Sequence, residues 1–405
     1  MPAVAIPKVL LPQNIDMSKW AVVACDQFSA EPAYWSELKN YIGDAPSALN
    51  LIFPEVFLNG DPSMRINNIH SEMNKYVAQE LFTEVEGIIL VEREVGDEVR
   101  VGLMVNIDLD AYDWRRVNVP VRATEDTIID RLPVRVDIRR GAQVELPHTL
   151  ILMDDCERSI IEPIYNRRDS LKKLYDFSLN MGGGRVRGYL VDNPQAVIAK
   201  IDALGDPDLQ IERYGCNTGI NLAVGDGNHS IASAKAYWEE VKPTLSDKEQ
   251  ETHPARYSLA EIVNLYGGGM AFEPIHRAVF GADEEFIRTL EAHLKDEGGT
   301  LTVITQEGER TISAPRTAST AIKAVQECLE AELAKNKSLK ADYIHNQGRL
   351  SEVIGRKGGV GIVMPAFPAE ELFGYVVNIG NLPKKAFSIG EPEHKRYYLE
   401  TRRIK

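Results

Sequence analysis

The stretch from Ile220 to Val241 combines residue types that could bind and act on a phosphate group. It opens with a short apolar run, Ile220–Val224, which is typical of a buried strand. A glycine turn follows, and from Asn228 apolar residues recur at helical spacing. A helix that begins at such a turn directs backbone N–H groups and a partial positive charge at whatever lies in front of it, commonly phosphate. The turn and the first helical residues are Gly225, Asp226, Gly227, Asn228, His229 and Ser230.

The same stretch also has a purely structural interpretation. Many α/β proteins pass from a strand into a helix through Asp-Gly without binding a ligand, and the motif alone favours neither interpretation. Asn228 and Ser230 are residue types that cap helices. His229 adds a titratable donor in front of the helix, which favours the functional interpretation.

A second candidate lies near the start of the chain. Trp20–Cys25 is an apolar run that predicts a core strand, and Asp26 and Gln27 follow it directly. In α/β sheets the C-terminal ends of strands are where ligands bind. Alternatively, Asp26 caps the helix predicted to begin at Pro32.

Composition limits the class of protein. The chain has 405 residues and a formal net charge of −14, which argues against a nucleic-acid or anionic-membrane partner. No apolar run reaches the roughly 18 residues that a membrane span needs, and the N-terminus does not resemble a signal peptide. Four scattered cysteines fit a reducing compartment. We expect a cytoplasmic protein that acts on a small-molecule substrate, and association into a homo-oligomer stays open.

Strand-like and helix-like segments alternate loosely along the chain, with hairpins between them. Glu86–Glu92 and Glu98–Asp108 predict one hairpin, residues 299–317 predict another, and Ser159–Phe177 predicts a helix. We therefore expect an α/β or α+β fold with a mixed sheet flanked by helices. The predicted division is an α/β domain at 1–265, with the central motif, and a smaller α+β part at 266–405 that packs back on the same site.

The landmarks together resemble the domain of unknown function 1015 family over nearly the whole chain. The family's Asp-Gly-His-His-Arg motif before a helix stands here as Asp226-Gly227-Asn228-His229-Ser230. A Thr-Glu segment leading to an arginine stands as Thr124-Glu125 and Arg131, and a Pro-x-His-Arg element as Pro274-Ile275-His276-Arg277. A late Pro-x-Lys element stands as Pro383-Lys384-Lys385 before Phe387.

The chain departs from the family pattern at several of these positions. Asn228 replaces the first histidine of the motif, and Ser230 replaces its arginine. Near Asp26 the usual Pro-Pro-Tyr-Asp is Ala24-Cys25-Asp26-Gln27. The chain therefore resembles a divergent branch of the family.

The motif is also similar to the phosphate-binding motif of the ParB/sulfiredoxin fold, which opens a helix and binds nucleotide phosphates. The resemblance implies a small-molecule phosphotransferase, a kinase of free L-serine or a similar hydroxylated metabolite, with ATP or ADP as donor and Mg²⁺. It implies catalytic roles for Asp26, as the base, and for Asp226 and His229, with Asp226 also at the metal. The implied phosphate-binding residues are Gly225, Gly227, Asn228, Ser230, His276, Arg277, Lys384 and Lys385, and the implied substrate-binding residues are Gln27, Glu125 and Arg131.

Two other functions stay open. One is metal-dependent hydrolysis through Asp226, His229, His276 and His345, although no pair of histidines has the i, i+4 spacing of a zinc site. The other is a sensor that binds a nucleotide without turnover. His276 alone is more often structural than catalytic, Lys384 and Lys385 are compatible with a surface pair, and His148 is interpreted as structural.

Overall fold

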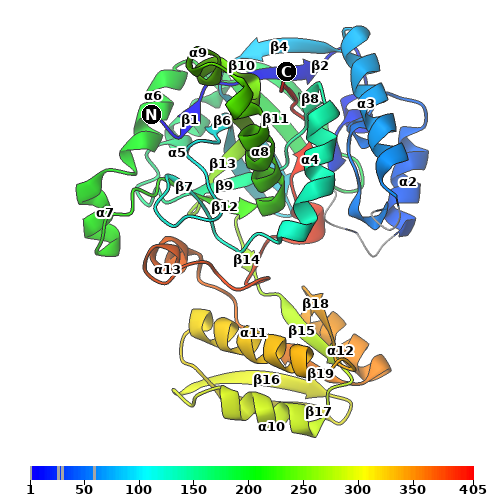
Figure 1. The fold of residues 1–405 in the computed structure, drawn as a ribbon, viewed down its shortest axis with the longest axis vertical. Helices are drawn as coiled ribbons and strands as arrows, with labels where there is room; N and C mark the ends of the chain where they lie inside the picture. Colours follow the sequence, from blue (N-terminus) through cyan, green and yellow to red (C-terminus); the bar gives the residue numbers. More distant parts are fainter. Residues whose placement is uncertain (1, 25–27, 29–31, 58–60) are drawn as a thin grey trace. The chain divides into compact units, whose positions relative to one another are not determined.

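The computed structural model describes residues 2–24, 28, 32–57 and 61–405. The chain forms two compact units (Figure 1). The first comprises Met1–Met270, Val377–Gly380 and Pro392–Lys405, and the second comprises Ala271–Val376 and Asn381–Glu391. The predicted division into domains at 1–265 and 266–405 stays a prediction. Asp26 and Gln27 lie outside the described residues.

A nine-stranded mixed sheet forms the centre of the first unit. Its order is β10-β11-β5-β6-β13-β9-β12-β7, and β1 pairs with β6. Only the β13–β9 and β12–β7 pairs are parallel. This confirms the predicted mixed sheet. The strands are β1 (Val4–Ala5), β5 (Ile89–Val95), β6 (Glu98–Asp108), β7 (Val121–Ala123), β9 (Leu150–Met153), β10 (Lys172–Ser178), β11 (Arg185–Leu190), β12 (Leu222–Asp226) and β13 (Tyr257–Asn264).

Alternation along the strands gives the sheet two apolar faces. In β5, Leu90 joins one buried cluster, and its neighbours Ile89 and Val91 join the other. The first cluster includes residues of helices α5 (Ile161–Asn166), α6 (Pro194–Ala203) and α8 (Asn228–Val241). The second includes residues of α2 (Pro32–Ile42), α3 (Ser63–Ala78) and the C-terminal segment from Tyr397 to Ile404. Helices therefore cover both faces, as predicted.

Short elements complete the first unit. Three two-stranded ribbons pair segments that are distant in sequence, and one of them brings the end of the chain against β8. They are β2 (Lys8–Pro12) with β4 (Phe82–Glu86), β3 (Val22–Val23) with β21 (Tyr397–Tyr398), and β8 (Val144–Glu145) with β22 (Arg402–Arg403). The other helices are α1 (Met17–Trp20), α4 (Leu132–Gly141), α7 (Pro207–Tyr214) and α9 (Asp247–Thr252).

The second unit contains an antiparallel five-stranded sheet in the order β17-β16-β19-β15-β18. The β16–β17 hairpin confirms the one predicted over residues 299–317. The elements are β14 (Phe272–Glu273), β15 (His276–Phe280), α10 (Glu284–His293), β16 (Gly299–Thr305), β17 (Gly308–Ala314), α11 (Ala318–Lys335), β18 (Lys340–Ile344), α12 (Gln347–Lys357), β19 (Val360–Val363) and β20 (Ser388–Ile389); α13 is Leu372–Asn378.

One predicted element is wrong. The helix expected over Ser159–Phe177 is only the short α5, and the strand β10 takes the second half of that range. Tyr175 in β10 is buried and lies opposite Gly188 of β11, so strand pairing overrides the local helical pattern.

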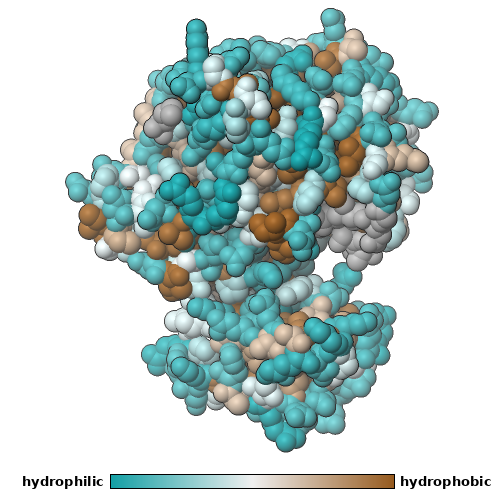
Figure 2. All heavy atoms as spheres, in the orientation of Figure 1, coloured by the Kyte–Doolittle hydropathy of each residue, from teal (hydrophilic) through white to brown (hydrophobic). Residues whose placement is uncertain are grey.

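The visible surface is mainly hydrophilic, with hydrophobic atoms gathered in separate patches (Figure 2). Among the helices of the described residues, none combines the length and the apolar character that a membrane crossing requires.

Candidate functional site

The predicted strand–turn–helix motif is present. β12 ends at Asp226, Gly227 follows with φ 81° and ψ 28°, and α8 begins at Asn228. A Cβ added at Gly227 would lie 3.0 Å from the Cα of Thr149, and its positive φ is unfavourable for other residues. Glycine is therefore required at this turn, because only glycine fits both constraints.

Packing explains why the helix begins at this point. Ile231, Ala234 and Trp238 of α8 are fully buried against the sheet, as their helical spacing predicts. Gly227 has no side chain with which to cap the helix, and the first backbone N–H groups of any helix lack partners within the helix. The start of α8 therefore has the geometry of an anion-binding site.

Asp226 is held as a carboxylate. Its Oδ1 accepts a hydrogen bond from the Gly227 N–H (2.8 Å), and its Oδ2 lies 3.2 Å from Lys395 Nζ. Burial alone would raise the pKa of Asp226, but the neighbouring Lys395 and His148 and the hydrogen bonds outweigh burial and lower the pKa. Asp226 therefore carries its charge at neutral pH and places Lys395 beside the turn.

Acid should weaken this pair. Because its pKa is lowered by folding, Asp226 contributes stability above the ordinary carboxyl pKa of 3.8, and that contribution is lost as the pH falls below it. We expect the wild type to lose more unfolding free energy than Asp226→Asn between about pH 5 and about pH 2.5. Urea titrations at both pH values measure the difference, and equal losses would contradict the prediction.

His229 is fixed by the polar segment that precedes α4. The Ile128 N–H donates to His229 Nε2 (3.2 Å), so in this arrangement the ring proton is on Nδ1. Thr124 Oγ1 donates to the Val224 carbonyl (2.6 Å), which fastens the same segment to the end of β12. The Thr124-Glu125 segment therefore lies next to the turn, and Arg131 is exposed at the end of a 3-10 turn, Ile129–Arg131.

Two buried polar atoms at the turn lack partners. Within the described part of the chain, Asn228 Oδ1 and Thr149 Oγ1 are buried without a hydrogen bond. Such groups are rare in folded proteins and call for an explanation such as a ligand or an ordered water. A half-turn of the Asn228 amide would exchange the positions of its oxygen and its NH₂ group. In one orientation the side chain accepts a hydrogen bond from a donor, and in the other it donates to an anion.

Four of the predicted phosphate-binding residues belong to the second unit, namely His276, Arg277, Lys384 and Lys385. Arg277 is fully buried; its Nε donates to Gln326 Oε1 (3.2 Å), and its Nη2 donates to the Lys385 carbonyl (3.1 Å). His276 Nδ1 accepts from the Met364 N–H (3.1 Å). Lys384 Nζ lies 3.7 Å from a carboxylate of α11, that of Glu330. The contacts named here lie within the second unit, and the role of these side chains at phosphate stays a prediction.

Sequence reasoning missed two residues. Lys395 was not among the predicted site residues, but it is buried against Asp226. His148, interpreted as structural, is also buried, and its ring packs edge-on against Tyr398 at 5.1 Å between centroids. No local spacing marks either residue, because strand pairing and the return of the C-terminal segment bring them to the turn.

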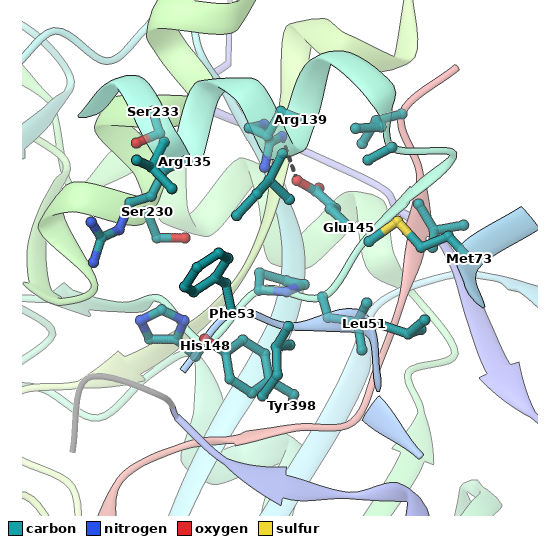
Figure 3. A pocket seen from close by; sticks show the side chains of 18 residues that line it. Leu51, Phe53, Met73, Arg135, Arg139, Glu145, His148, Ser230, Ser233 and Tyr398 are labelled. Atoms are coloured by element: carbon teal, nitrogen blue, oxygen red, sulfur yellow. Dashed lines mark hydrogen bonds and ion pairs between the residues drawn. The ribbon is translucent and has the colours of Figure 1, made fainter. Parts of the chain in front are cut away.

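A cavity of about 130 Å³ lies beside this site, between α4 and α8. We call it the α4–α8 cavity. Ser230, Arg135 and His148 lie on one side of it, and Leu51 and Met73 lie on the other (Figure 3). It therefore has a polar end next to the start of α8 and an apolar end away from it.

The described residues contain no cluster of metal ligands of the kind that metal-dependent hydrolysis would need. No three or more His, Cys, Asp or Glu side chains in that part of the chain are grouped as ligands of one metal ion.

Residues 9–346 match the family described as "Protein of unknown function (DUF1015)", and the chain belongs to this family. This confirms the resemblance found in the motifs. A search of curated proteins finds no match.

The solved structures that match the chain are distant. A conserved hypothetical protein from Pyrococcus furiosus is 12% identical, with 74% of this chain and 90% of that chain covered and a TM-score of 0.37. A free serine kinase in complex with AMP is 10% identical, with 75% and 92% covered and a TM-score of 0.41. SbnI with a C-terminal truncation, from Staphylococcus aureus, is 11% identical, with 74% and 81% covered and a TM-score of 0.36.

Proposed function

We propose that the protein is a nucleotide-dependent phosphotransferase that acts on the hydroxyl group of a small metabolite, such as free L-serine. The observation that carries the proposal is the start of α8, where Gly227 in a left-handed conformation opens an uncapped helix next to Asn228, whose Oδ1 is buried without a hydrogen bond. Helix N-termini of this kind bind phosphate through backbone N–H groups and the helix dipole. A ParB/sulfiredoxin-like motif is part of the same proposal.

The charges around the turn suit phosphoryl transfer, which depends on positioning and on neutralising phosphate oxygens. In the reaction, the acceptor oxygen forms a bond to the terminal phosphorus, and the bond from that phosphorus to its bridging oxygen breaks. The leaving group is ADP when ATP is the donor, and AMP when ADP is the donor. The hydroxyl proton passes to a carboxylate, and Asp26 stays the predicted base. Lys395 would neutralise charge at the turn, and His229 would hold a phosphate oxygen.

Mg²⁺ fits the site in part. Asp226 offers an ionised carboxylate, but its two oxygens already face the Gly227 N–H and Lys395 Nζ. Mg²⁺ commonly takes one or two carboxylates and fills its other positions with water and phosphate oxygens. Asp226 would thus be a single protein ligand, and the ion would neutralise the phosphates when bound.

The test is transfer from ATP and from ADP, with Mg²⁺, to L-serine and a panel of hydroxylated metabolites. We expect turnover, and we expect His229→Ala to lower it about 100-fold, the size of effect seen when one transition-state contact is removed. The control is His293→Ala, since His293 is exposed at the end of α10 and should leave turnover unchanged.

The outcomes separate the alternatives. Nucleotide binding by calorimetry without any turnover would favour the sensor. The absence of both nucleotide binding and turnover would overturn the proposal. It would mean that the changes at Asn228 and Ser230 have removed the phosphate site.

A further inference from the structure

The α4–α8 cavity has the size of one aromatic ring. Its volume of about 130 Å³ is close to that of an engineered apolar cavity of about 150 Å³ that takes up benzene. Its walls come mainly from apolar residues of the first unit, among them Leu51, Met73, Ile138, Ala142, Val144 and Ile404. An apolar space of this size gains free energy by taking up an apolar group.

The charges in the cavity wall are neutralised within the protein. Arg139 Nη2 lies 2.6 Å from Glu145 Oε2, and Glu145 Oε1 also lies 2.8 Å from Arg402 Nη2. Burial alone would raise the pKa of Glu145, but Arg402 and Arg139 lower it, so this carboxylate stays ionised and paired. The charges of Glu145 and Arg139 in the wall are therefore paired within the protein.

The polar end connects the cavity to the candidate phosphate site. His148 lines the cavity and also lies close enough to Asp226 to lower its pKa. Ser230 lies in the first turn of α8 and faces the same end, as does Arg135 of α4 (Figure 3). A molecule in the cavity would thus place its polar groups beside the start of α8.

We propose that the α4–α8 cavity binds an apolar, ring-sized substituent of the phosphoryl acceptor, so that the preferred acceptor is a hydroxylated metabolite larger than serine. The inference rests on the proposed function. The acceptor hydroxyl would lie at the start of α8, and its ring would lie among Leu51, Met73 and Val144.

Three β-hydroxy amino acids test this proposal. L-serine, L-threonine and L-threo-3-phenylserine share the same head group, and the last two differ only in a methyl or a phenyl on the carbon that bears the hydroxyl. We expect kcat/KM for phenylserine to exceed that for threonine by about tenfold or more, since burial of several apolar carbons discriminates by at least that factor.

Cavity-filling variants localise the effect. Ala142→Leu and Val134→Phe should each lower kcat/KM for phenylserine more than kcat/KM for L-serine, and so remove the preference, because both positions line the cavity. Ala203→Leu on α6, where the alanine is exposed, is the matched control and should keep the preference. Two filling variants are used so that misfolding of one, visible in its circular dichroism, does not decide the result.

Three results would overturn the proposal. If serine and threonine are phosphorylated and phenylserine is not preferred, or if its preference survives both filling variants, the cavity is not the acceptor site and the proposed function stands. If no acceptor is phosphorylated, calorimetry of phenylserine decides: binding lost in Ala142→Leu supports the cavity as a ligand site without the kinase activity, and absence of binding to the wild type overturns it.

Discussion

Replacing the buried arginine Arg396 with methionine is expected to lower the free energy of unfolding by about 3–5 kcal/mol. Arg396 Nε lies 2.8 Å from Glu261 Oε2, and its Nη2 lies 2.5 Å from Glu400 Oε2. All three side chains are almost completely buried. Methionine matches the length of the stem but removes the charge, so two carboxylates would stay in the interior without their main cation.

The surroundings of Arg396 strengthen this expectation. Burial alone would lower its pKa, but Glu400 and Glu261 outweigh burial and raise the pKa well above the ordinary value. Tyr175 donates to the other oxygen of Glu400, and burial, together with that carboxylate, raises the pKa of Tyr175 well above 10. The cluster is thus a connected network, and loss of one member leaves its partners without compensation.

The measurement is urea unfolding followed by tryptophan fluorescence. All four tryptophans of the chain, Trp20, Trp35, Trp114 and Trp238, belong to the first unit, so the signal reports that unit alone. Arg403→Met is the matched control, because Arg403 is exposed in the same C-terminal segment and should change stability by less than about 0.5 kcal/mol. Equal losses in the two variants would show that burial of the charge is not the cause.

Local signals in the sequence were enough to predict the parts of the fold that depend on neighbouring residues. The β12–α8 motif was predicted because a glycine turn and a helical apolar face both lie within one short stretch. The β5–β6 hairpin was predicted because Gly96 and Asp97 mark its turn. The strand β10 was missed because its conformation depends on pairing with β11, which no local pattern of its own sequence specifies.

The site shows the same division between local and distant information. Asp226, Gly227, Asn228 and His229 were predicted, and they lie together because they are consecutive. Lys395 comes from the far end of the chain, and only the pairing of β21 with β3 and of β22 with β8 carries that segment back across the sheet. The α4–α8 cavity is likewise made by segments that no sequence spacing connects.

Gly227→Val should reduce nucleotide affinity on the order of 100-fold, if the start of α8 holds the phosphates. A β-branched residue with φ near 81° is strained by roughly 1–3 kcal/mol, and its Cβ would also press on the backbone of Thr149. Only a change in the backbone conformation of the turn would relieve both the strain and the contact with Thr149. That change would turn the first N–H groups of α8 away from the phosphate position. Titration calorimetry with ATP and with ADP measures the change.

Gly219→Val separates the loss of the phosphate site from general destabilisation. Gly219 also has a positive φ, 71°, but a Cβ at this position meets nothing within 4 Å, so valine there adds backbone strain without a clash. We expect Gly219→Val to lower the unfolding free energy while nucleotide affinity stays within about twofold of the wild type, since binding depends on the folded turn at Gly227 and not on overall stability. If both variants weaken nucleotide binding in proportion to their loss of stability, then the geometry at Gly227 has no specific role, and the phosphate-binding start of α8 must be abandoned.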